Sequence, residues 1–343
     1  DRIESRGLGD VYKRQVPFED MPFLLNPPEG YISTANNRTI GNKFPYYISG
    51  LWADPSRGSR IKEVLDEDRK LNLEDMVALQ LDLTSNYSKE ILPFILKNAG
   101  NLDDIVYNRA IKFLKEWNHI ESIDSEGTLL FHSISNQIIK NIYYDELSLL
   151  GDKYFETFTG LKYITKRNLR RILKRNSNKW VDDIRTPNKI ETIDEIITKS
   201  IEGGIQKVVD TYGPNWSNWK WGTAHSLTHK HILGDVKILN YLFNLNIGPY
   251  LSGGSDVTPN AGGYSLHKGF NQTSGASMRR IVDFSDLNRT SMILPTGQSG
   301  LHNSPHYSDQ ASLYHDGKYR VTYFDKDYIV SSPEFKHLRL IPK

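Results

Sequence analysis

The hydrophobic pattern of this chain changes twice along its length, and that order constrains its fold more than any other feature. Residues 61–250 carry apolar side chains at helical spacing, whereas glycines, prolines and β-forming residues dominate residues 251–343. Before them, Gly30-Tyr31-Ile32 has the pattern of a glycine turn that feeds a short strand. A strand, a long helical region and further strands predict an α+β fold in which the two ends of the chain pair in one sheet.

Local signals place several elements. Asn72 stands where a helix N-cap should, with Asp75 three residues later and apolar residues after it. Pro93 predicts a helix boundary close by, because proline disrupts a helix interior. Further helices are expected at residues 61–65, 103–117, 128–150, 169–173 and 190–209, and strands at 279–284, 290–294 and 319–324.

Composition excludes several classes of function. The 343 residues are enough for one large domain or two ordinary ones. Lys and Arg number 43 against 41 Asp and Glu, so the net charge of +2 creates no field that favours nucleic acid or an anionic membrane. No apolar stretch is long enough to span a bilayer. The absence of cysteine from the sequence excludes disulfides and thiol nucleophiles.

The run PEGYISTANNR, residues 28–38, contains the candidate catalytic residue Asn36. An asparagine amide donates two hydrogen bonds without moving a proton, and the end of a strand would hold it in place. Both properties suit a donor to the oxyanion of an acyl-transfer reaction. An Asn-Asn pair after a strand is also a common turn. The run alone therefore leaves an oxyanion donor and a turn as two interpretations.

Six segments, taken in order, resemble one known family. They are VPFEDMPFLLNPPEGYISTANNR (16–38), YYISGLWADPSRGSRIKEVL (46–65), DMVALQLDLTSNYSKEILPFIL (75–96), NWSNWKWGTAHSLTH (215–229), GASMRRIVDF (275–284) and LPTGQSGLHNSPHYSDQ (294–310). Together they resemble the penicillin acylase family, which comprises penicillin amidases, cephalosporin acylases and acyl-homoserine-lactone acylases. A motif such as GQSG is weak by itself, but several in the same order are specific.

The resemblance implies a fold, an activity and site residues. The fold would be part of the αββα four-layer sandwich of N-terminal nucleophile (Ntn) hydrolases, with a long helical insertion. The activity would be cleavage of an N-acyl amide by way of an acyl-enzyme, on a serine whose own α-amine is the base. Asn36 would complete the oxyanion hole, and an arginine behind it would orient it. We expect that arginine to be Arg60, because the helix start fixes the register, with Arg57 as the alternative.

The resemblance also implies that the nucleophile lies elsewhere. The chain begins with Asp1, and the internal pairs Gly58-Ser59 and Gly254-Ser255 are better explained as loop residues. We therefore expect a C-terminal fragment of a catalytic β subunit, inactive alone. Its partners would be the α subunit, the remaining part of the β subunit and a small N-acyl substrate such as a β-lactam or an acyl-homoserine lactone. The family is usually periplasmic or secreted.

The chain divides into four expected parts. Residues 1–15, DRIESRGLGDVYKRQ, do not resemble the family and look in part like translated sequencing adapter. Residues 16–60 would be a catalytic-core segment with the oxyanion asparagine, 61–250 a mainly helical region, and 251–343 a β-rich segment that returns to the core sheet.

Metal sites have weak support in the sequence. His225 and His229 have the i, i+4 spacing that zinc can use on a helix, and His231 follows. No HExxH glutamate accompanies them, so a hydrogen-bonded structural role is the interpretation favoured for His225. No cofactor is required. The resemblance leaves calcium open for a complete enzyme, but residues 44–47, FPYY, offer no carboxylate and no ligand is identified.

Two other clusters admit competing interpretations. Residues 166–175 form a basic amphipathic helix that could bind phosphate or membrane, and we favour a solvated helix face. Trp216, Trp219 and Trp221 could form a sugar-stacking platform, although such clusters mostly pack in cores. The competing functions are therefore a carbohydrate-binding protein, or a binding or structural protein that keeps the fold without the chemistry.

Overall fold

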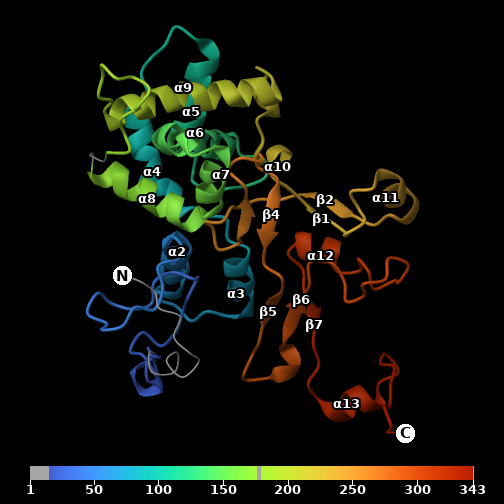
Figure 1. Ribbon diagram of the computed structural model, residues 1–343. Coiled ribbons are helices and arrows are strands. Elements are labelled where there is room, and N and C mark those ends of the chain that lie inside the picture. Colours follow the sequence, from blue (N-terminus) through green and yellow to red (C-terminus); the bar gives the residue numbers. More distant parts are fainter. Residues whose placement is uncertain (1–14, 176–178, 343) are drawn as a thin grey trace, which may run out of the picture.

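The computed structural model describes residues 15–175 and 179–342, and it shows a helical half joined to two small sheets (Figure 1). The long helices are α4 (Asn86–Lys97), α5 (Ile105–Glu116), α6 (Glu126–Leu149), α8 (Lys162–Arg175) and α9 (Ile193–Tyr212). The shorter helices are α2 (Ser56–Leu65), α3 (Leu73–Gln80), α7 (Asp152–Gly160), α10 (Trp221–Ala224), α11 (Lys237–Phe243), α12 (Ala311–His315) and α13 (Lys326–Ser331). Three 3-10 turns lie at Phe18–Asp20, Trp216–Asn218 and Leu287–Arg289.

Helix α6 is the centre of the core. Its residues Leu129, Ile134 and Ile138 are fully buried between α5 and α9. Each such side chain contributes roughly 1.5–3 kcal/mol by leaving water. Helices α6 and α9 approach closely at Gly204, where a Cβ would stand only 2.7 Å from the Cα of Ile134. A glycine is therefore required at this crossing.

The local signals for helices are largely confirmed. Asn72 and Asp75 form the expected capping box at the start of α3, and the expected helices at 103–117 and 128–150 correspond to α5 and α6. The boundary expected near Pro93 is wrong, because Pro93 lies inside α4. Burial of Ile91 and Ile95 fixes that helix through tertiary packing despite the lost backbone donor.

The strands form two sheets, both within the C-terminal half of the chain. One has the order β2-β1-β4-β3 and the other the order β5-β6-β7. Their bounds are β1 (Ser226–His229), β2 (Ile247–Leu251), β3 (Gly262–Tyr264), β4 (Gln272–Gly275), β5 (Arg279–Ile281), β6 (Ser291–Ile293) and β7 (Arg320–Val321). Pairing is antiparallel except between β1 and β4. The predicted α+β class is confirmed, and β5, β6 and β7 fall within the three expected strand regions.

The expected pairing of the two chain ends is wrong. Residues 16–60 contain no strand, although the structure describes all of them. Gly30 does form the predicted turn, with a φ of 77° and a hydrogen bond from its N–H to the carbonyl of Pro27. The residues that follow Gly30 include too few β-forming residues to continue as a strand. This part of the chain lies beside α2 instead (Figure 1). The four-layer sandwich is thus represented only in part.

Helix α8 holds the N-terminal segment, residues 16–55, in place through contacts at Gly50 and Asp54. Arg170 pairs with Asp54 at 3.0 Å and with Glu90 at 3.1 Å, and Arg167 donates to the carbonyl of Gly50 at 3.0 Å. Lys166 pairs with Asp256 and is buried. The expectation of a solvated basic face is therefore wrong for Lys166, Arg167 and Arg170, whereas Arg171, Lys174 and Arg175 are exposed as expected. The carboxylates come from distant parts of the sequence, which is why the local pattern did not reveal them.

Helix α2 begins earlier than expected and includes Gly58-Ser59. The loop assignment for this pair is wrong for a packing reason. A Cβ on Gly58 would stand 2.7 Å from Oδ1 of Asn37, so glycine lets the helix pack against the Asn36-Asn37 turn.

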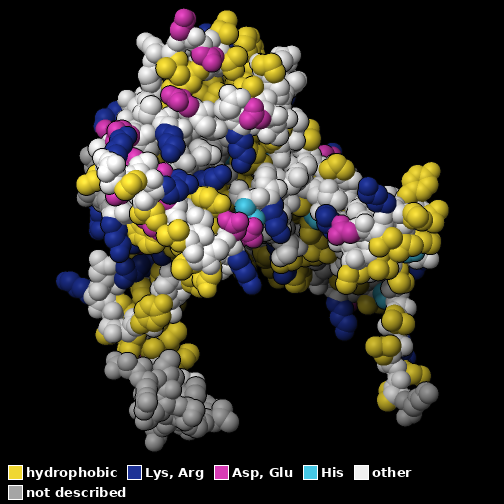
Figure 2. All heavy atoms as spheres, turned by 45° about the horizontal axis from the view of Figure 1, so that its top comes forward, with side chains coloured by type: hydrophobic (Ala, Val, Ile, Leu, Met, Phe, Trp, Pro, Cys, Tyr) yellow, Lys and Arg dark blue, Asp and Glu magenta, His cyan; other side chains and the backbone are white. Residues whose placement is uncertain are grey.

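Helix α11 is unusual in its exposure. None of its seven residues, all of which the structure describes, is buried, although five are apolar or aromatic. Hydrophobic side chains gather over this region in Figure 2. Within the described residues, no helix is long and apolar enough to cross a membrane.

Candidate active site

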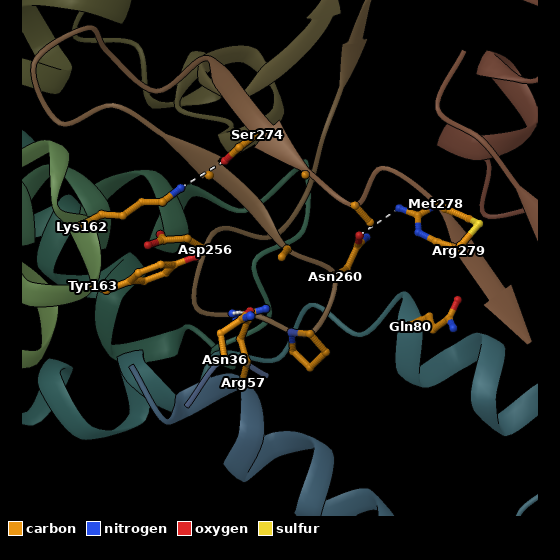
Figure 3. Close-up of a pocket in the computed structure, with 15 residues that line it drawn as sticks. Asn36, Arg57, Gln80, Lys162, Tyr163, Asp256, Asn260, Ser274, Met278 and Arg279 are labelled. Carbon is orange, nitrogen blue, oxygen red and sulfur yellow. Dashed lines mark hydrogen bonds between the residues drawn. The ribbon is translucent and has the colours of Figure 1, made fainter. Parts of the chain in front are cut away.

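A pocket of about 420 Å³ opens where the N-terminal segment, α2, α8 and the first sheet meet (Figure 3). Its walls bring together residues that are far apart in sequence. They include Asn36 from the N-terminal segment, Arg57 from α2, Lys162 and Tyr163 from α8, Asp256 and Asn260 from one loop, Ser274 from β4 and Arg279 from β5. The sequence candidate Asn36 is thus in a pocket that three cationic side chains line.

The backbone and side chain of Asn36 are both held. Its φ is 61°, a left-handed conformation that asparagine tolerates better than most residues. Its carbonyl accepts the N–H of Ala53 at 2.8 Å, and its side-chain Oδ1 accepts Nη2 of Arg57 at 2.9 Å. A guanidinium can only donate, so this contact assigns the oxygen to the arginine side. The Asn36 NH₂ group, at the other end of the amide, donates no hydrogen bond to any residue that the structure describes.

Arg57 makes the contact that was predicted for Arg60. Nη2 of Arg57 donates to Oδ1 of Asn36 and, at 2.8 Å, to the carbonyl of Ala35. Arg60 lies most of a helical turn further on, where Nε donates to Asp82 at 2.7 Å and Nη1 to Glu63 at 3.2 Å. The preference for Arg60 is therefore corrected to Arg57 as the neighbour of Asn36. The catalytic roles themselves stay predictions.

Asp256, which lines the pocket across from Asn36, forms a buried ion pair with Lys166. Burial opposes ionisation of Asp256, but the charges of Lys166 and Lys162 outweigh it and lower the pKa of the carboxyl. Burial lowers the pKa of the Lys162 ammonium, and Lys166 and Arg57 lower it further against the attraction of Asp256. Lys162 donates to the hydroxyl of Ser274 at 3.1 Å. The result is a net positive wall with one carboxylate already neutralised.

Arg279 closes the other end of the pocket. It is buried, donates to the carbonyl of Tyr314 at 2.7 Å and to Oδ1 of Asn260 at 3.0 Å, and stacks 3.9 Å over the ring of Tyr314. The motif GASMRRIVDF pointed to this region without assigning Arg279 a role. Lys162, Asp256 and Asn260 carried no signal in the sequence, because only the tertiary fold joins them to Asn36.

A buried contact between a carboxylate and an imidazole lies beneath the loop that carries Asp256. Glu121 and His132 face each other at 3.3 Å, and both are almost fully buried. Burial opposes ionisation of Glu121, yet His132 and the hydroxyls of Ser255 and Ser85 lower its pKa. The N–H of Gly254 also donates to the Glu121 carbonyl at 2.7 Å. Gly254-Ser255 therefore lies outside helices and strands, as predicted, but in a buried and well-held loop.

The three histidines of the possible zinc motif do not gather. His225 follows α10, whereas His229 ends β1, so they share no helix face. His225 is fully buried, with Nδ1 2.9 Å from the Ser252 carbonyl, and burial lowers its pKa to about 4. Its predicted structural role is confirmed. Among the described residues no three His, Asp or Glu side chains form a metal-binding cluster, and the tract 44–47 does not fit calcium.

The tryptophan cluster is part of the core. Trp219 and Trp221 are fully buried, and Trp221 stacks between the rings of His132 and His225, each centred 4.6 Å away. Buried indole faces cannot stack on a sugar. A carbohydrate platform at Trp219 and Trp221 is therefore excluded, whereas Trp216 is partly buried, with the guanidinium of Arg109 5.3 Å from its ring centroid.

Comparison with known proteins identifies the family of this chain. The family model described as penicillin amidase matches residues 5–330. The chain belongs to the penicillin amidase family. The match begins within residues 1–15, the segment expected to fall outside the family; residues 1–14 lie outside the described residues.

Two related acylases are consistent with this family. The chain is 26% identical over 315 residues to the acyl-homoserine lactone acylase QuiP of Pseudomonas fluorescens strain Pf0-1, covering 87% of this chain and 37% of that protein. It is 22% identical over 303 residues to the penicillin acylase 2 proenzyme of Pseudomonas sp. strain SE83, covering 88% and 37%. The chain thus spans less than two-fifths of these relatives.

A solved structure shares the fold. The thermostable penicillin G acylase of Alcaligenes faecalis superposes with a TM-score of 0.53 and 13% identity, over 93% of this chain and 58% of that one. This penicillin amidase family member is accordingly an α+β protein with the fold of a penicillin acylase.

Proposed function

We propose that this chain is part of an enzyme that hydrolyses N-acyl amides through an acyl-enzyme. The observation that carries the proposal is the Asn36–Arg57 contact at the pocket. An asparagine whose oxygen is fixed by a guanidinium presents its NH₂ as a preset donor, which stabilises the oxyanion of a tetrahedral intermediate without reorganisation. The acylase names of the relatives support the same reaction class.

The nucleophile in this proposal is a serine supplied by residues outside this sequence. Its free α-amine takes the proton from its hydroxyl, and the hydroxyl oxygen attacks the amide carbonyl. The C–N bond then breaks, and the amine product leaves with the proton. Water finally hydrolyses the acyl-enzyme ester, which releases the acid and restores the serine. The word proenzyme in the name of one relative fits a nucleophile released by processing. The remaining part of the β subunit and an α subunit would complete the enzyme.

The chemistry as proposed needs no cofactor. The substrate is a small N-acyl amine, with a β-lactam and an acyl-homoserine lactone as the two classes that the relatives' names suggest. Antibiotic breakdown and quorum quenching are the corresponding biological roles. By family resemblance the working compartment is the periplasm or the cell exterior.

The test is an assay of two preparations. The complete gene product is expected to hydrolyse a chromogenic phenylacetyl or fatty-acyl amide, whereas purified residues 16–343 alone are expected to leave it intact. An intact gene product with no turnover on any N-acyl amide would favour the alternative, a binding protein that keeps the fold. Turnover by residues 16–343 alone would place the nucleophile within this chain.

A further inference from the structure

Lys162 is the cationic side chain of the pocket whose donors are least used. Arg57 holds Asn36 and Ala35, and Arg279 holds Tyr314 and Asn260. Lys162 makes one hydrogen bond, to Ser274, and no ion pair with any carboxylate that the structure describes. An ammonium has three donors, so two remain available to a ligand.

The protein is built to place this ammonium at the pocket. Lys162 begins α8 and reaches toward Ser274 on β4 (Figure 3). A Cβ on Gly263 would lie 2.2 Å from Nζ of Lys162 and 2.5 Å from Oγ of Ser274. Glycine at position 263 of β3 is therefore what leaves room for the pair.

The surrounding charges compensate the Lys162 ammonium only in part, because the carboxylate that attracts it, Asp256, is shared with a second lysine. Asp256 is the carboxylate that lines this pocket, and it already pairs with Lys166 in a buried contact. Arg57 and Lys166 both repel the ammonium of Lys162, and its partial burial weakens screening by water. An anionic group that entered the pocket would relieve this repulsion.

We propose that Lys162 and the hydroxyl of Ser274 bind a carboxylate carried by the substrate, so that the enzyme prefers N-acyl amides with a carboxylate. The ammonium donates to one carboxylate oxygen. The Ser274 hydroxyl accepts from Lys162 and can donate its own proton to the other oxygen. This inference rests on the proposed function, because it names the substrate class of the same pocket.

The carboxylate can belong to the acyl side or to the amine side of the substrate, and matched ligands separate the two. Phenylacetamidobenzoate and phenylacetanilide differ by a carboxylate on the amine side. Glutaryl anilide and pentanoyl anilide differ by a carboxylate on the acyl side. Whichever side faces Lys162 should show the preference.

Binding of these pairs to the full chain, measured by calorimetry, tests the inference without requiring hydrolysis. In one of the pairs the carboxylated member should bind about tenfold or more tightly, since a hydrogen bond to a charged group is at stake. K162Q should abolish that difference and leave the neutral member unchanged, and K162R should restore part of it. K268Q is the matched control for net charge, because Lys268 is exposed and away from the pocket.

Each outcome decides one claim. Equal binding within both pairs, or an equal loss for both members in K162Q, would overturn the carboxylate preference. If K162Q does not fold, S274A is the second variant, and an undiminished preference in it would overturn the shared role of Ser274. In the complete enzyme, turnover without any preference would contradict this inference alone. Retained carboxylate binding without turnover would contradict the proposed function alone.

Discussion

Nη2 of Arg57 lies 2.9 Å from Oδ1 of Asn36 and 2.8 Å from the carbonyl oxygen of Ala35. One nitrogen thus ties the side chain of the asparagine to the backbone of the residue before it. Because Ala53 also donates to the Asn36 carbonyl, the asparagine is fixed from both α2 and the segment that leads into it. Asn36 lies outside helices and strands, so these contacts with Arg57 and Ala53 are what fix the direction of its side chain.

Replacement of Asn36 by alanine should remove the proposed oxyanion donor. In the complete enzyme, N36A should lower kcat by roughly 10²–10³ and leave KM nearly unchanged, with a small loss of stability because alanine tolerates the φ of 61° less well than asparagine. Steady-state kinetics with a chromogenic amide measure this. N101A is a suitable control, because Asn101 is an exposed asparagine that does not line the pocket. An unchanged kcat in N36A would exclude the assignment.

The two arginines should differ in what their replacement by lysine costs. R57K should reduce kcat about tenfold or more, because an ammonium on a shorter chain cannot hold Asn36 and Ala35 from the same position. R60K should keep activity and lose about 1 kcal/mol or less of stability through its pair with Asp82. Kinetics and urea unfolding of both variants decide between them, and loss of activity in R60K alone would restore the original preference.

Sequence reasoning reached the parts of this fold that local chemistry determines. The capping box at Asn72, the turn at Gly30 and most of the long amphipathic helices depend on neighbours in sequence and were predicted, the exception being the course of α4 through Pro93. Lys166 and Arg170 looked like a solvated face because their partners, Asp256 and Asp54, lie about 90 and 116 residues away. Asn36 could be found because a family motif surrounds it. Lys162 could not, since its place at the pocket depends on Gly263 and Ser274 of another sheet.

The buried pair of Lys166 and Asp256 should be costly to break. D256N leaves the Lys166 charge buried without a partner, and we expect a loss of about 3–5 kcal/mol in the free energy of unfolding. D235N is the matched control, because the Lys230–Asp235 pair is largely exposed and should be worth about 0.5 kcal/mol or less. Urea unfolding at neutral pH compares them, and similar losses in both variants would contradict a special role for burial.

The same pair predicts a response to acid. The pKa of Asp256 is lowered in the folded state, so its contribution to stability is present above the ordinary aspartate value of 3.8 and is lost as the pH falls through the lower folded value. Wild-type stability should therefore fall in this acid range more steeply than that of D256N. Parallel curves for the two proteins would show that Asp256 does not titrate as described.

His315 should make stability fall at a higher pH. Burial, with the nearby charges of His229 and Arg279, lowers its pKa from 6.5 to about 4. Between these values the unfolded chain binds a proton that the folded chain does not, so stability decreases as the pH drops from 6.5 toward 4. H315F keeps the ring stacked on Tyr250, whose centroid is 4.0 Å away, and removes the titration. Urea midpoints across this range should fall less in H315F, and an equal fall would refute the assignment.

The exposed apolar side chains of α11 should govern the solubility of this chain. Ile238 is 71% exposed and Tyr241 is 88% exposed, so little contact within the described residues stabilises either. Apolar groups clustered on one surface favour association between molecules. The double change I238S and Y241S should therefore raise the concentration at which the chain precipitates, with a change in unfolding free energy of about 0.5 kcal/mol or less.

A core isoleucine provides the contrast for that experiment. I91S places a hydroxyl and a cavity where a fully buried side chain stood, and it should cost about 2–5 kcal/mol. Light scattering and urea unfolding of the two variants separate a surface effect from a packing effect. If the α11 variant lost stability on the scale of I91S, its side chains would be packed within this chain. If the unfolding free energy of the α11 variant equalled that of the wild type and its solubility did not rise, the aggregation would arise from another exposed surface.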